Sequence, residues 1–170
     1  IMNTHGKGLS ENYVGDIQII SNIENGNYTF LNALYYKINF SKFQLSLGLQ
    51  DLKEEFCVSQ YGSYLTNSSF GIPSNFPLNF NVPIYPKTTL GFLFFINFSD
   101  NLILRNCIFD GDAGKLEDDK YNLNWKINKK EGLLYMSEIE YKNEANKYTS
   151  LKLGAFYHSG QFINPEDTSI

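Results

Sequence analysis

The segment Phe43-Gln44-Leu45-Ser46-Leu47-Gly48-Leu49-Gln50 places apolar residues at odd positions and polar residues or glycine at even ones. This alternation is typical of a β-strand, because successive side chains of a strand point to opposite faces of the sheet. The pattern recurs, strictly or loosely, in about eight segments. They are residues 14–23, 29–40, 43–50, 90–98, 102–109, 121–128, 133–141 and 151–158. The sequence therefore predicts an all-β, antiparallel fold.

Composition and charge narrow the function classes. Aromatic residues make up 16% of the chain and charged residues 19%, a profile that suits many strands and turns. The net charge is −4, and Arg105 is the only arginine among 14 scattered basic residues. Nucleic-acid binding needs a concentrated basic face, so we expect no nucleic-acid partner. No apolar run approaches the ~18 residues of a transmembrane helix, although this leaves membrane-spanning strands open.

The predicted connections alternate between short and long. Tight turns are expected at residues 41–42, 99–101 and 129–132, whereas residues 56–87 form a long connection rich in Gly, Pro, Ser, Asn and aromatics. An irregular stretch of that length is unusual in a compact domain unless it has a function. Short turns at one end and long loops at the other are typical of an outer-membrane barrel.

The apolar stripes could face either lipid or a soluble core. A soluble β-sandwich that binds a carbohydrate or a protein would bury Phe92, Phe94, Trp125 and Leu151 between its sheets. A transmembrane barrel would turn such stripes outward. The stripes that begin at residues 43, 90, 121, 133 and 151 contain no charge. One charge at the membrane midplane costs roughly 2–4 kcal/mol, so this favours the barrel.

Catalytic and metal-binding patterns are missing from the sequence. The acidic group Asp51, Glu54 and Glu55 meets the end of a predicted strand, where a solvated rim is the better interpretation than a glycosidase pair. Cys57 and Cys107 are far apart and form no zinc motif, and we expect them to be unpaired. We therefore predict no enzymatic activity, no metal and no cofactor.

Several segments, in order along residues 15–162, resemble the carbohydrate-selective porin family of the OprB type. They are Gly15-Asp16-Ile17-Gln18, Ser21-Asn22-Ile23, Ala33-Leu34-Tyr35-Tyr36, Leu47-Gly48-Leu49-Gln50-Asp51-Leu52-Lys53-Glu54-Glu55-Phe56, Leu65-Thr66-Asn67-Ser68-Ser69-Phe70-Gly71-Ile72-Pro73, Tyr85-Pro86-Lys87-Thr88-Thr89-Leu90-Gly91, Ile108-Phe109-Asp110-Gly111-Asp112 and Leu153-Gly154-Ala155-Phe156-Tyr157-His158-Ser159. One such segment would be weak, but their common order makes the resemblance specific.

The resemblance implies an antiparallel transmembrane β-barrel of about sixteen strands in a bacterial outer membrane. Such a barrel lets carbohydrates such as glucose diffuse passively, so its partners would be sugars and outer-membrane lipid. Self-association of the barrel stays open. With about eight strands, residues 1–170 would form a single domain, the N-terminal half of the barrel. Because Ile1 opens the chain without an initiator Met or export signal, we expect a processed or missing N-terminus.

Sugar permeation needs hydrogen-bonding groups and aromatic surfaces along the pore wall. The predicted lumen-facing residues are Asp16, Gln18, Asn22, Gln44, Gln50, Arg105, Lys126, Glu138, Glu140 and Lys152. The alternative is that most of them only wet the wall. Arg105 is the strongest candidate, because a planar guanidinium can grip a vicinal diol. Against it stands a structural ion pair with a neighbouring glutamate.

The long connection at residues 56–87 offers aromatic residues of its own. If it folds inward, it would narrow the pore and present Tyr61, Tyr64, Phe70 and Phe76 to a passing sugar. The alternative is a surface loop packed on the rim. The resemblance favours the inward fold.

Overall fold

A computed structural model describes residues 1–15, 19–21, 23–59, 61–67, 70–73, 76–77, 79–143 and 149–161. The described part contains eight strands and three short helical turns. The strands are β1 (Met2–Thr4), β2 (Tyr28–Phe30), β3 (Leu34–Asn39), β4 (Phe43–Gln50), β5 (Thr89–Asn97), β6 (Leu102–Asp110), β7 (Leu133–Lys142) and β8 (Ser150–His158). The helical turns are η1 (Ser10–Val14), η2 (Leu52–Glu54) and η3 (Gly62–Tyr64). No helix among the described residues is long and apolar enough to cross a membrane.

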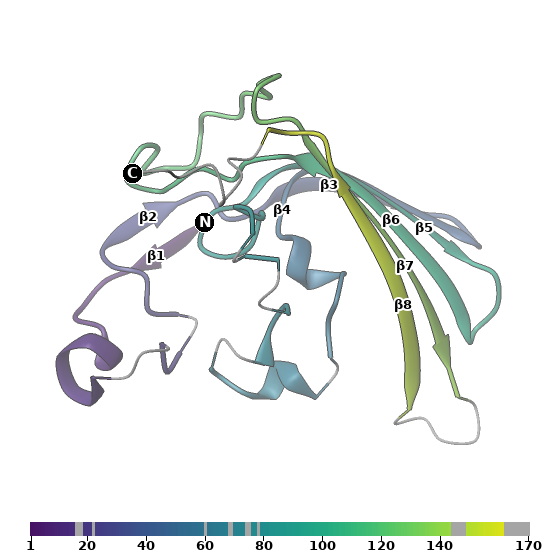
Figure 1. Ribbon diagram of the computed structural model, residues 1–170, viewed down its shortest axis with the longest axis horizontal. Helices are drawn as coiled ribbons and strands as arrows, with labels where there is room; N and C mark the ends of the chain where they lie inside the picture. The colour runs from purple at the N-terminus through teal and green to yellow at the C-terminus, as the bar shows by residue number, and fades with distance from the viewer. Residues whose placement is uncertain are drawn as a thin grey trace, which may run out of the picture.

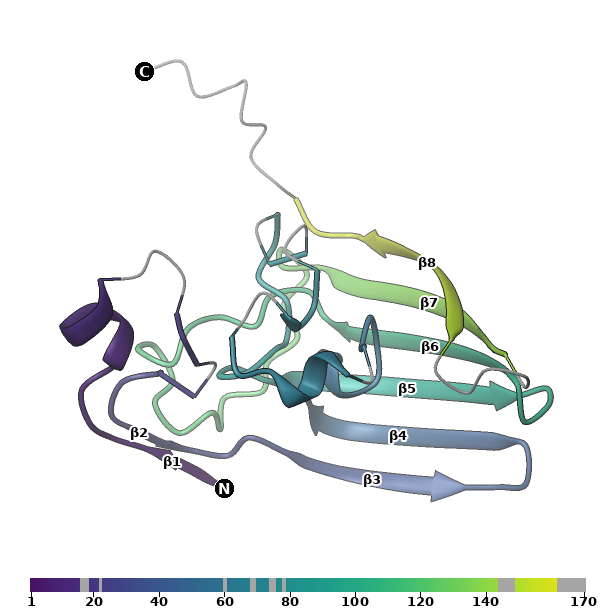
Figure 2. The same cartoon turned by 90° about the horizontal axis from the view of Figure 1, so that it is seen from below.

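Strands β3 to β8 form one curved, antiparallel sheet in which sequence neighbours are also sheet neighbours (Figures 1 and 2). Strands β1 and β2 pair separately. The short turns after β3 and β5 lie at one end of the sheet, and the long connections after β4 and β6 lie at the other (Figure 2). The predicted all-β, antiparallel fold is confirmed. Among the described residues the sheet stays open, with β3 and β8 at its edges.

Two predicted strands are wrong in position. Residues 121–128 belong to the connection between β6 and β7 and form no strand. The reason is Asn122, which is buried with a left-handed φ of 52° and donates hydrogen bonds to Leu31 O and Thr88 O. These tertiary contacts override the local alternation. In residues 14–23, the structure describes Val14 as the end of η1 and residues 19–21 as irregular.

The two faces of the sheet differ in chemistry. The convex face carries almost only apolar side chains, and many are exposed: Leu47 by 63%, Phe92 by 40% and Leu151 by 72%. The soluble-sandwich alternative required Phe92 and Leu151 to be buried, so these exposures contradict it. The opposite, concave face pairs small and buried side chains across the strands, such as Ser46 with Leu93.

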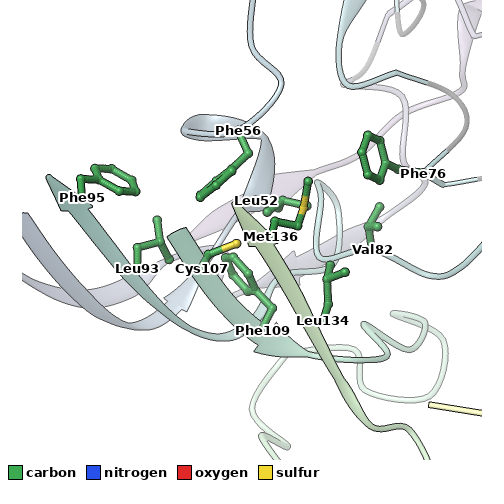
Figure 3. Packing of buried hydrophobic residues seen from close by; sticks show 10 residues of the cluster. All are labelled: Leu52, Phe56, Phe76, Val82, Leu93, Phe95, Cys107, Phe109, Leu134 and Met136. Carbon is green, nitrogen blue, oxygen red and sulfur yellow. The ribbon is translucent and has the colours of Figure 1, made fainter. Parts of the chain in front are cut away.

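The described residues of the β4–β5 connection lie beneath the arch of the sheet and pack on its concave face (Figure 1). Figure 3 shows the resulting core, in which side chains of the connection meet side chains of β5, β6 and β7. The connection supplies Leu52, Phe56, Phe76 and Val82, and the sheet supplies Leu93, Phe95, Cys107, Phe109, Leu134 and Met136. Burial of this apolar surface holds the connection against the concave face of the sheet.

Candidate pore-lining site

Four charged side chains meet on the concave face. The register of β6, β7 and β8 places Arg105 opposite Glu138, and Glu140 opposite Lys152. The guanidinium of Arg105 lies 3.2 Å from Glu138 Oε1 and 2.8 Å from Glu140 Oε2. Lys152 Nζ lies 3.6 Å from Glu138 Oε1 and 4.0 Å from Glu140 Oε1. We call these four residues the charge cluster.

The charge cluster is well shielded from solvent. The side chains of Arg105, Glu138 and Glu140 are 13%, 6% and 7% exposed, and that of Lys152 is 26% exposed. Moving single charges out of water is costly, and the alternation of two cations with two anions offsets that cost. Arg105 also lies 6.0 Å from the ring centre of Phe95. Its guanidinium is therefore engaged by protein groups, as the ion-pair alternative anticipated.

Two backbone groups of the β4–β5 connection complete the cluster. The N–H of Cys57 donates a hydrogen bond of 3.0 Å to Glu138 Oε2. Lys152 Nζ donates one of 2.8 Å to the carbonyl oxygen of Val58. The cluster thus joins the sheet to the connection that covers its concave face.

A cavity of about 370 Å³ lies beside the cluster. Val58 and Phe76 line it from the connection, and Glu138, Lys152 and Phe156 line it from the sheet. The rings of Phe76 and Phe156 approach within 5.0 Å between centroids. A sugar has an apolar ring face and a rim of hydroxyl groups, so a cavity with aromatic and charged walls matches both sides of it.

The other polar residues predicted on the lumen face lie in varied places. Gln44 is half-buried on the concave side of β4, directly opposite the core residue Phe95. Gln50 is buried, donates to Gly91 O and accepts from Ser46 Oγ, so its amide is used within the protein. Lys126 is exposed on the β6–β7 connection and lines a separate cavity of about 320 Å³. Asp16, Gln18 and Asn22 lie outside the described residues.

The aromatic residues predicted on the long connection are partly exposed. Tyr61 directly precedes η3, Tyr64 is its last residue, and both are exposed. Phe70 is also exposed and lines a smaller cavity of about 180 Å³ with Phe56. Phe76 belongs to the buried core instead.

Asp51 plays a role that the sequence did not predict. We expected a solvated carboxylate, but Asp51 is only 5% exposed, so that interpretation is wrong. Its two oxygens accept hydrogen bonds from Lys53 N at 2.8 Å and Tyr85 N at 3.0 Å. Burial raises the pKa of this carboxyl, and the two backbone donors oppose the rise. Asp51 thereby links the two ends of the β4–β5 connection. The sequence offered a signal for half of this role, because an Asp directly before a helical turn is a common N-cap residue.

The described part of the chain contains no cluster of metal-binding side chains and no disulfide. There, no three His, Cys, Asp or Glu side chains are grouped in a way that could hold a metal ion. Cys57 and Cys107 are both free thiols. Burial raises the pKa of the Cys57 thiol, Glu138 raises it further and Lys152 lowers it.

Comparison with known proteins identifies the family. The family model described as "Carbohydrate-selective porin, OprB family" matches residues 1–169. Searches of curated proteins and of solved structures gave no match. The matching family consists of transport channels and not of enzymes, which confirms the prediction that this protein is not an enzyme. With its antiparallel sheet, its apolar convex face and this match, the chain belongs to the OprB family of carbohydrate-selective porins.

Proposed function

We propose that this protein lets carbohydrates such as glucose diffuse passively across a bacterial outer membrane. The observation that carries the proposal is the division of one sheet into two faces. Within β3 to β8, every charged residue except Asp110, the last residue of β6, is on the concave face. In a porin the concave side is the wet lumen and the convex side faces lipid.

The dimensions of the strands support this orientation. Strand β5 has nine residues, and at about 3.3 Å per residue such a strand is roughly 30 Å long. When tilted by about 40°, it covers most of the apolar band of an outer-membrane barrel, about 25 Å. Lipid around the convex face would remove exposed side chains such as Leu47 and Leu151 from water.

The open edges of the sheet support a larger barrel. Strands β3 and β8 each have one neighbour among the described residues. Unpaired backbone N–H and C=O groups are not tolerated in the hydrocarbon core. We infer that these edges pair with further strands, so that residues 1–170 act as one domain, the N-terminal half of a barrel of about sixteen strands. Complete barrels could also associate as homo-oligomers.

The sugar path is proposed between the β4–β5 connection and the wall. The described residues of this connection pack on the concave face, which supports a constricting role for residues 56–87. Exposed Tyr64 and Phe70 would offer stacking surfaces on the approach. The cavity that Phe76 and Phe156 line together would hold the sugar ring beside them, while the charged side chains of Glu138 and Lys152 face its hydroxyl groups.

Liposome swelling with the full-length protein tests this function. We expect glucose to enter the liposomes, and larger oligosaccharides to enter more slowly because the connection narrows the path. Phe156→Ala should alter the relative rates of different sugars. The matched control is Tyr157→Ala, because Tyr157 is the next residue of β8, faces the convex side and is exposed. Absence of sugar entry from liposomes that contain the folded protein would refute the proposal.

A further inference from the structure

Besides the ion pair of Lys37 in β3 with Glu55, two backbone groups of the β4–β5 connection bond to charged side chains of the sheet. Glu138 Oε2 accepts from Cys57 N at 3.0 Å, and Lys152 Nζ donates to Val58 O at 2.8 Å. Adjacent residues of the connection are thus held by one anion and one cation from adjacent strands. Hydrogen bonds that involve a charged group are about twice as strong as neutral ones. Both contacts are therefore charge-assisted and join the connection to β7 and β8.

The backbone of Cys57 supports a functional link. Its φ of 57° lies in the left-handed region, which non-glycine residues seldom adopt. Such a conformation persists where the surroundings determine it, and such sites cluster at ligand clamps and switches. In this conformation the N–H of Cys57 donates a hydrogen bond to the buried carboxylate of Glu138. Removal of the Glu138 carboxylate would leave the N–H of Cys57 without this hydrogen-bond acceptor.

The remaining two members of the charge cluster, Arg105 and Glu140, form ion pairs within the cluster. Arg105 binds both glutamates, at 3.2 Å and 2.8 Å, and among the described residues these two carboxylates are the partners of its ion pairs. Glu140 is the cross-strand partner of Lys152, and its Oε1 lies 4.0 Å from Lys152 Nζ. Arg105 and Glu140 therefore balance the charge of the cluster, whereas the contacts with Cys57 and Val58 come from Glu138 and Lys152.

We propose that Glu138 and Lys152 form a latch that holds residues Cys57 and Val58 against the barrel wall and so sets the width of the sugar path. The claim that the latch sets the width of the sugar path rests on the proposed porin function, whereas the claim that it holds the connection does not. Val58, Glu138 and Lys152 all line the cavity beside the cluster, so opening of the latch would move one wall of that cavity. Glu138 and Lys152 are then positioning residues of the connection and do not need to contact the sugar.

The native thiol of Cys57 reports on the latch without any sugar. Cys57 is half-buried, whereas Cys107 is 3% exposed in the core. In the full-length protein in liposomes, a membrane-impermeant maleimide is applied and mass spectrometry measures its rate of attachment to Cys57. We expect Lys152→Met to accelerate labelling at least about tenfold, which corresponds to about 1.4 kcal/mol in the opening equilibrium. Loss of Lys152 also raises the pKa of the thiol, which acts against faster labelling, so an acceleration reports on exposure.

Three control variants separate the latch from general damage to the cluster. Glu140→Gln removes a charge from the cluster but no contact with the connection, and it should label close to the wild-type rate. Lys152→Arg keeps a charged donor and should restore slow labelling. Lys42→Met, in the exposed β3–β4 turn, controls for the loss of a lysine. Should Lys152→Met fail to insert, Lys152→Gln replaces it, because its side chain is neutral and shorter than that of lysine.

The outcomes separate the latch from the porin function. The latch is overturned if Lys152→Met labels at the wild-type rate, or if Glu140→Gln labels as fast as Lys152→Met. Faster labelling in Lys152→Met alone, together with faster entry of larger oligosaccharides, supports both parts of the inference. Faster labelling without sugar entry in any variant supports the latch and refutes the porin function. Normal glucose entry with unchanged labelling refutes the latch and leaves the function intact.

Discussion

Replacement of Leu47 by lysine tests whether lipid covers the convex face. Leu47 lies in the middle of β4, between Tyr36 of β3 and Phe92 of β5, and is 63% exposed. In water, a lysine at so exposed a site would change stability by no more than about 0.5 kcal/mol. In the middle of a bilayer it must be desolvated, and the expected cost is about 2–4 kcal/mol.

The assay is equilibrium unfolding by urea from phospholipid vesicles, followed by tryptophan fluorescence, with the full-length protein. Gln44→Lys is the matched control, because Gln44 is on the same strand but on the concave face. A lumen-facing lysine stays hydrated, so Gln44→Lys should cost less than about 1 kcal/mol. If Leu47→Lys costs no more than Gln44→Lys, the assignment of the two faces is refuted, and with it the proposed orientation in the membrane.

Two further predictions concern the packing of the wall and the anchoring of the β6–β7 connection. A Cβ atom at Gly91 would overlap the ring of Phe109, so Gly91→Ala should destabilise the protein by about 1–3 kcal/mol in the same urea assay, and a neutral effect would contradict the packing. Burial would raise the pKa of Asp119, but hydrogen bonds from Asn124 N and Leu123 N, together with Lys87, bring it below its ordinary value. Because the folded pKa is the lower one, the contribution of Asp119 to stability should be complete above about pH 4 and disappear as the pH falls through the folded pKa. Melting curves of wild type and Asp119→Asn should therefore converge in acid; a constant difference at every pH would show that the charge is irrelevant.

Local sequence patterns predicted the parts of the fold that local physics determines. The expected strand at 43–50 coincides with β4, and the segments at 102–109 and 133–141 fall within one residue of β6 and β7. In these strands the side-chain environment alternates with every residue, so the sequence alternates too. Residues 121–128 alternate equally well, yet buried Asn122 binds Leu31 and Thr88, partners far away in the chain. Alternation alone cannot reveal such contacts.

The candidate site was predictable only in part, for a similar reason. The sequence placed Arg105, Glu138 and Lys152 on one face, because each occupies an inward position of its strand. Their contacts with the connection involve the N–H of Cys57 and the carbonyl of Val58, which are 81 and 94 residues from their partners. Every residue except proline has these two backbone groups, so their use leaves no mark on the sequence.

The balance of charge in the cluster bears on which solutes the channel favours. Arg105 and Lys152 contribute two positive charges, and Glu138 and Glu140 contribute two negative ones, all within 4.0 Å of an opposite partner. Paired charges of this kind leave little net field beyond a few ångströms, since each potential is cancelled by its neighbour. A path lined by such a cluster offers hydrogen-bonding groups without strongly attracting or repelling ions. We therefore expect the wall at this point to favour neutral sugars over sugar phosphates or uronic acids of similar size.

Glu138→Gln would leave the cluster with excess positive charge, and it should shift the preference of the channel towards anionic solutes in reversal-potential measurements. An unchanged reversal potential in that variant would mean that the ion path runs elsewhere along the concave face.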